Sequence, residues 1–132
     1  MAGKRRGRWK PAGLGLLALA GWITLAGAAA AGKCGYDYCW GAVATGPNGA
    51  SGYSFSHVSE RNAHDVARST CGEGKCTQVR TFYNACGAIA MGASDAWGWA
   101  SGASRDAAQA QALAYCSRNG PGCAVRVWAC SP

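Results

Sequence analysis

The chain has 132 residues, enough for one domain, and carries a formal net charge of +7 and eight cysteines. A charge of this size suggests a nucleic-acid or membrane partner, but five of the 13 Lys and Arg residues lie within the first ten residues. The other eight, against six Asp and Glu, leave a net charge of +2. Because binding to a phosphate backbone needs many cationic contacts, we expect no nucleic-acid partner.

The basic start is followed by a charge-free, largely apolar run over residues 11–32 that ends in small residues. A basic region, an apolar region and an Ala-x-Ala cleavage site, in this order, are typical of a secretory signal peptide. We therefore predict that residues 1–31 are a signal cleaved close to Ala30, which leaves no membrane span. Residues 32–132 then form a single cysteine-rich domain that is secreted or periplasmic.

Two alternatives for the N-terminus remain open. The apolar run is long enough to span a bilayer, so an uncleaved anchor is one of them. The Arg5-Arg6 pair matches part of a twin-arginine signal, which leaves open whether export follows or precedes folding. A lipoprotein is disfavoured, because Lys33 rather than a small residue precedes Cys34.

The rest of the chain contains one unit twice. The motif CGAIA from Cys86 resembles WGAVA from Trp40, and the Ala-Cys pair that ends at Cys86 resembles the pair that ends at Cys130. The two copies therefore span about residues 40–86 and 86–130, and Cys86 belongs to both.

Each copy predicts a strand, a turn, a second strand, a helix and a third strand. Ser59 and Ser104 are the expected N-caps of the helices, because a hydroxyl there can accept from the free N–H groups of the first turn. The predicted fold class is α+β, with two β-β-α-β repeats forming a mainly antiparallel sheet that carries both helices on one face. The expected strands are residues 40–45, 53–57 and 76–83 in the first copy and 86–91, 97–99 and 123–130 in the second.

An even number of cysteines in a short exported chain indicates a framework of disulfides. Two pairs occupy equivalent places, where each helix ends and the next strand begins. Cys86 and Cys130 end equivalent strands, so we expect their disulfide to join the two copies. The predicted pairs are Cys71–Cys76, Cys116–Cys123, Cys86–Cys130 and, with the remaining two, Cys34–Cys39.

Several motifs together resemble a known family: WGAVA, GYSFS, NACGAIAM, GWAS, VRVWAC and the helical spacing of Ser, two Ala and Cys. They are similar to the exported bacterial family called domain of unknown function 4189, over about residues 39–130. The resemblance implies a small secreted or periplasmic cysteine-rich domain. It brings no established activity and no active-site residues, and Cys34–Cys39 lies at its edge.

Residues for catalysis or metal binding are few. His57 has no orienting acid placed by spacing, and His64 and Asp65 are expected to point apart as neighbours on a helix. Glu60 and Asp106 lie in the first turns of the helices, where their negative charges interact favourably with the helix dipole. This structural role explains both acids. The cysteine spacings lack the C-x2-C pattern of zinc and thiol-redox sites. We predict no catalytic residue, no metal and no cofactor.

Aromatic residues on the strands are the remaining candidates for function. We expect Tyr53, Phe55 and Trp99 to pack in the core against the alanine-rich helices, because bulky rings would fill the space that alanine leaves. Whether Trp97 and Trp128 face the core or the solvent is not decided by the sequence. An exposed ring or a strand arginine would suit a partner or an acidic ligand. The candidate binding residues are Trp97, Trp99, Trp128, His57 and Arg126.

The sequence thus predicts a small, monomeric, exported binding domain that contacts a protein or a cell-envelope component. An inhibitor or immunity protein for an envelope-active enzyme fits this class, since a rigid surface loses little entropy on binding. Two alternatives remain: a hydrolase of the envelope that uses His57, and a purely structural secreted protein.

Overall fold

The computed structural model describes residues 32–72 and 75–132, so the predicted signal, residues 1–31, lies outside the described residues. The β-β-α-β order occurs twice, as predicted. No helix in the described part of the chain is long and apolar enough to cross a membrane. The first copy contains β1 (Trp40–Thr45), β2 (Ser51–His57), α1 (Glu60–Thr70) and β3 (Gln78–Tyr83), and the second contains β4 (Ala85–Met91), β5 (Trp97–Gly102), α2 (Arg105–Ser117) and β6 (Ala124–Ser131).

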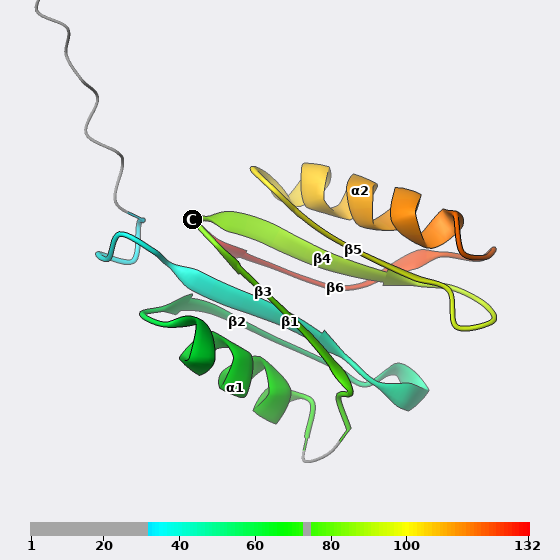
Figure 1. Ribbon diagram of the computed structural model, residues 1–132, viewed down its shortest axis with the longest axis horizontal. Coiled ribbons are helices and arrows are strands. Elements are labelled where there is room, and N and C mark those ends of the chain that lie inside the picture. The colour runs from blue at the N-terminus through cyan, green and yellow to red at the C-terminus, as the bar shows by residue number, and fades with distance from the viewer. Residues whose placement is uncertain (1–31, 73–74) are drawn as a thin grey trace, which may run out of the picture.

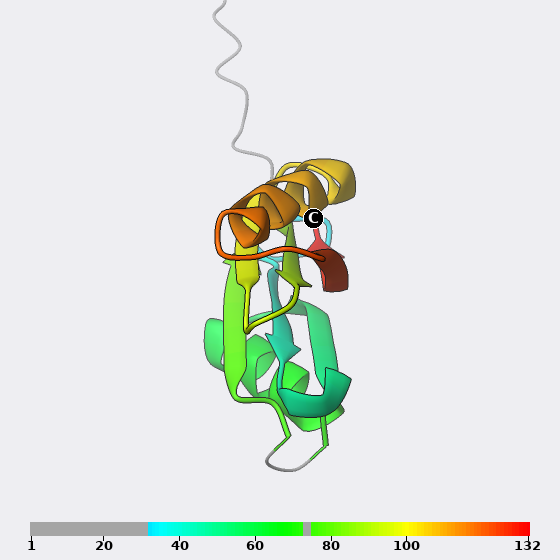
Figure 2. The same ribbon diagram turned by 90° about the vertical axis from the view of Figure 1, so that its right-hand side faces the viewer.

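Each copy builds its own three-stranded antiparallel sheet, in the order β2-β1-β3 for the first and β5-β4-β6 for the second. The sheets face each other, and each helix covers the outer face of its own sheet (Figure 1). In the perpendicular view the helices again lie apart, α2 at the top and α1 in the lower half (Figure 2). The architecture is therefore helix, sheet, sheet, helix.

The α+β class, the antiparallel pairing and the disulfide staples are confirmed, but the predicted single sheet with both helices on one face is divided in two. The reason lies in the central strands, which are buried on both faces. Ala42 and Ala44 of β1 pack against α1, while Val43 between them packs against Ile89 of the other sheet. A strand buried on both faces reads as a continuous apolar run, which does not reveal what covers its second face.

Small residues let each helix lie close to its sheet. A Cβ added to Gly52 would collide with the carbonyl oxygen of Ala67 in α1, and one added to Gly98 would collide with that of Ala112 in α2. The predicted caps are present. The hydroxyl of Ser59 accepts from the backbone N–H of Asn62 in α1, and that of Ser104 accepts from the backbone N–H of Ala107 in α2. Glycine and alanine therefore set the spacing of the outer layers.

The phenyl ring of Phe82 fills the space between the two sheets. It comes from β3 and lies over two equivalent glycines, one from each central strand. A Cβ added to Gly41 would be 2.7 Å from the ring, and one added to Gly87 would be 2.5 Å from it. The ring centroid lies 6.3 Å from that of Trp99 in β5. One side chain thus contacts both repeats.

The four disulfides of the structure are those of the predicted pairs. The expected role of one pair is wrong, however. Cys86 and Cys130 are opposite each other on the neighbouring strands β4 and β6, so their disulfide lies within the second sheet and does not join the copies. At the equivalent place in the first sheet, the rings of Trp40 and Tyr83 pack with centroids 5.0 Å apart.

Removing Cys86–Cys130 should cost more stability than removing Cys71–Cys76, because its cysteines are 44 residues apart rather than 5. Loop-closure entropy gives about 4 kcal/mol for the longer loop and about 2 kcal/mol for the shorter. Urea unfolding of the oxidised double variants C86S/C130S and C71S/C76S measures both losses. Equal losses would contradict the entropic account.

The variant Gly87→Ala should lose about 1–3 kcal/mol of unfolding free energy, the usual cost of forcing an extra methyl group into a packed core. Combining it with Phe82→Leu, which removes the ring, should cost less than the sum of the two single losses. The same unfolding measurement on all three variants tests this. Strictly additive losses would mean that the ring does not sit over Gly87.

Candidate functional site

The sandwich has two open sides, and each brings an edge strand of one copy next to the third strand of the other. On one side β2 lies beside β6, where the backbone N–H of Ser56 donates to the hydroxyl of Ser131 at 2.8 Å. On the other side β5 and β3 meet through their side chains, where the guanidinium of Arg80 sits 5.3 Å from the ring centroid of Trp97. The two sides are equivalent in topology and different in side chains.

Three exposed aromatic rings gather on the first side. We call the hollow there the β2–β6 groove; its volume is about 390 Å³, and it is lined by Tyr53, Phe55, Trp128, Ala129 and Cys130. Tyr53, Phe55 and Trp128 are 52%, 55% and 38% exposed, and they lie next to one another in this groove. The groove is therefore largely aromatic.

Strand alternation explains how two of these rings reach the groove. Ser54 of β2 faces α1, where its hydroxyl donates to the carbonyl oxygen of Ala63 at 2.6 Å. Tyr53 and Phe55 must then point to the opposite face, toward the layer of the second sheet. Their rings lie nearly parallel, at 8°, with centroids 6.4 Å apart.

A difference between the copies leaves this side open. Phe82 is paired with Gly41, and Ala129 is paired with the equivalent Gly87, so Ala129 occupies the position that Phe82 has in the first copy. On the β3–β5 side, the Phe82 ring packs against Trp99. On the β2–β6 side, the methyl group of Ala129 leaves the space that forms the groove.

Two arginines flank the β2–β6 groove. The guanidinium carbon of Arg105, at the start of α2, lies 4.0 Å from the ring centroid of Trp128, a short cation–π contact. Arg126 reaches from β6 toward the turn of the first copy, with Nη1 close to Gly49. Neither arginine forms an ion pair within residues 32–72 and 75–132, and no acidic side chain of these residues lines the groove.

A second hollow, the β5–α2 groove, lies on the outer edge of β5 and measures about 630 Å³. Its tryptophans are half-buried and held from inside the sandwich by Arg80 and Phe82. The side-chain amide of Asn119 donates to the carbonyl oxygen of Trp97 at 3.1 Å and so caps this strand edge. The lining includes Trp97, Trp99, Ser101, Gln111, Tyr115 and Asn119.

The five candidate binding residues do not form one site. Trp97 and Trp99 line the β5–α2 groove, Trp128 lines the β2–β6 groove, Arg126 lies at its end, and His57 lines neither.

The expectation that Tyr53 and Phe55 lie in the core is wrong, whereas Trp99 packs at the edge of the inter-sheet cluster. The small residues Gly52 and Ser54, which alternate with the two rings along β2, are the sequence signal for this. A face of glycine and serine suits close approach of α1, which sends the rings the other way.

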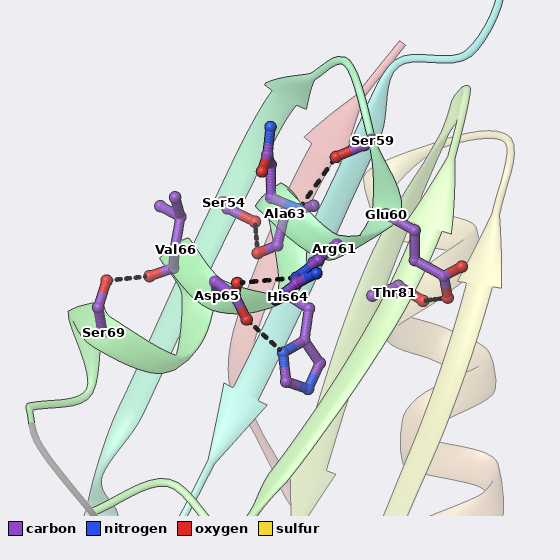
Figure 3. A network of polar contacts seen from close by, with 11 residues as sticks. Ser54, Ser59, Glu60, Arg61, Ala63, His64, Asp65, Val66, Ser69 and Thr81 are labelled. Atoms are coloured by element: carbon purple, nitrogen blue, oxygen red, sulfur yellow. Dashed lines mark hydrogen bonds and ion pairs between the residues drawn. The ribbon is translucent and has the colours of Figure 1, made fainter.

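The polar residues of α1 form a surface network (Figure 3). The expectation that His64 and Asp65 point apart is wrong: Nδ1 of His64 lies 3.2 Å from the Asp65 carboxylate, and both side chains are partly exposed. Asp65 also lies 3.9 Å from Arg61, and Glu60 accepts from the hydroxyl of Thr81.

This network contains no activated nucleophile. Across the described residues no hydroxyl is hydrogen-bonded to His64, and the side chain of His57 makes no hydrogen bond at all. A nucleophile and a base must lie within hydrogen-bond reach of each other. The same residues hold no group of three metal-ligating side chains.

The fold and its grooves define a class: a cysteine-rich α+β domain of two repeats, with four disulfides and an exposed aromatic edge. The chain belongs to the family described as Domain of unknown function (DUF4189), whose model matches residues 40–130.

A solved structure with a similar fold is the NMR structure of Rv1813c from Mycobacterium tuberculosis. The similarity has a TM-score of 0.55 at 25% identity and covers 99% of this chain and 97% of that one. Among curated proteins none matches the chain.

Replacing two exposed rings should leave the fold intact. The variant Tyr53→Ser/Phe55→Ser should change the free energy of unfolding by less than about 1 kcal/mol, because surface substitutions usually cost within about 0.5 kcal/mol each. Urea unfolding tests this, with Phe82→Ser as the buried control, whose side chain is 5% exposed. A loss for the double variant as large as for the control would place the two rings in the core.

Proposed function

We propose that this chain is an exported, disulfide-stapled binding domain that contacts a protein or a cell-envelope component through the β2–β6 groove. The observation that carries the proposal is the gathering of Tyr53, Phe55 and Trp128 in one groove, where their exposed fractions lie between 38% and 55%. An aromatic side chain offers roughly 150–250 Å², so the exposed parts of the three rings add to about 300 Å². An exposed apolar patch of that size is often functional.

Rigidity supports a binding role. Cys130 lines the groove and is bonded to Cys86 of the central strand, so the groove's floor is held covalently. Trp128 is held in place by Arg105. A surface ordered before binding loses less entropy on association, as in inhibitors and immunity proteins.

Export is the second part of the proposal. Four disulfides suit an oxidising compartment, where such bonds persist. The basic and apolar start of the sequence suits a signal peptide that would deliver the domain there. The binding surface would then meet extracytoplasmic partners.

A hydrolase is less well supported. His57 is half-buried and lacks a hydrogen-bonded acid among the described residues, so it has no partner that would orient it as a base. The β5–α2 groove is also less suited to a partner, because its two tryptophans are already packed against Arg80 and Phe82.

Affinity capture from cell-envelope extract tests the proposal. The oxidised protein should retain specific components that the variant Tyr53→Ser/Phe55→Ser/Trp128→Ala does not retain, because the triple variant removes the exposed rings. The matched control is Tyr115→Ser, which removes a ring of similar exposure, 45%, from the other groove. Equal retention by the triple variant, or loss of retention in the control alone, would contradict a role for the β2–β6 groove.

A further inference from the structure

We infer that the β2–β6 groove binds an extended acidic peptide segment of a partner protein, which adds as a strand to the free edge of β6. This inference rests on the proposed function and names the occupant of the same groove. Four features of the groove carry it: its direction, its free edge, its charge and its size.

The groove is linear because its two walls run in the same direction. Arg126 lies beside Gly49 at one end, and Ser131 is hydrogen-bonded to Ser56 at the other. β2 has seven residues between these ends, which span about 23 Å at 3.3 Å per residue. A ligand that follows the groove must be extended.

Only one of the two edges is open for main-chain pairing near the rings. In β2, the backbone N–H of Tyr53 donates to the hydroxyl of Thr70 in α1 at 3.0 Å, so the helix caps this edge. β6 has a strand neighbour on one side only, which is β4. An edge of this kind pairs with an extended peptide through main-chain hydrogen bonds.

A strand added to β6 would meet aromatic groups on both of its faces. Tyr53 and Phe55 point from β2 toward the layer of the second sheet, so they would lie under alternate side chains of the added strand. Trp128 is paired with Ala88, which packs against α2, so Trp128 lies on the opposite face together with Arg105. Side chains that face Tyr53 and Phe55 should be apolar.

The charge around the groove selects for acidic residues. Arg105 and Arg126 flank it without an ion pair in residues 32–72 and 75–132, and no acid of these residues lines it. The Arg105 guanidinium lies over Trp128 and keeps donors free for a carboxylate. The peptide should therefore alternate apolar and acidic residues.

The size of the patch argues for a short segment rather than a second copy of the chain. A stable interface between proteins buries about 800 Å² on each partner, whereas the three exposed rings offer about 300 Å². The backbone edge of β6 adds hydrogen bonds rather than apolar area. A peptide strand of about seven residues fits these limits.

Selection of peptides from a random 12-residue display library tests the inference. The protein, purified in oxidised form after export, serves as the bait. We expect enriched peptides in which Asp or Glu alternates with aliphatic or aromatic residues. Their affinity should fall about tenfold or more in Arg105→Glu/Arg126→Glu and in Tyr53→Ser/Phe55→Ser, and should weaken with rising salt.

The matched control is Arg118→Glu, because Arg118 also lies over an aromatic ring, that of Tyr115 at 5.2 Å, but belongs to the other groove. It should leave peptide affinity unchanged. Two further measurements examine other occupants of the groove. Titration with polygalacturonate, monitored by tryptophan fluorescence, tests for an acidic glycan. Sedimentation of the protein alone tests for a second copy of the chain.

Three results would overturn the inference: no enriched peptide, enriched peptides without an acidic excess, or peptide binding that survives the double arginine variant. Binding of polygalacturonate in place of peptides would assign the groove to an acidic glycan, and a dimer lost in Tyr53→Ser/Phe55→Ser would assign it to a second copy. If capture from envelope extract depends on the three rings while no peptide is enriched, the proposed function stands and the peptide inference fails.

Discussion

The close approach of each helix to its sheet is the constraint on which the rest of the structure depends. Gly52 and Gly98 bring the helix backbones so near that any Cβ at these positions would collide with them. Ala42 and Ala88 continue these small-residue faces along the central strands. Most large side chains near the middle of the strands therefore point away from the helices, into the space between the sheets, whereas Trp40 and Trp128 lie on the helix-facing sides.

The space between the sheets is too narrow for all of these large side chains. Val43, Ile89 and Phe82 occupy its centre, with Phe82 lying over the glycines of both central strands. Rings on the edge strands can only be partly covered, because an edge strand has no neighbour on its outer side. Exposure of Tyr53 and Phe55 is thus a consequence of how the helices pack, and the disulfides support a domain of this size whose core is built largely from alanine.

Local features of the fold could be predicted from the sequence, whereas contacts between the copies could not. Repeated motifs gave the order of elements, the serine caps and the cysteine pairs, since each depends on residues close in sequence or on the equivalence of the copies. The division into two sheets depends on what covers the second face of β1, and the continuous apolar run of that strand carries no such information. The placement of Cys86–Cys130 follows from the same division, because β4 and β6 share a sheet that β1 does not enter.

The candidate site follows from a departure from the repeat. Tyr53 and Trp99 are equivalent, being paired with Val43 and Ile89, and each faces the third strand of the other copy. Trp99 meets Phe82 and is half-buried, whereas Tyr53 is 52% exposed on the side where Ala129 takes the place of Phe82. One alanine in the second copy, at the position of Phe82 in the first, thus accompanies an aromatic groove on one side of an otherwise duplicated scaffold. The copies share the architecture, and the difference between Phe82 and Ala129 decides which side is free to bind.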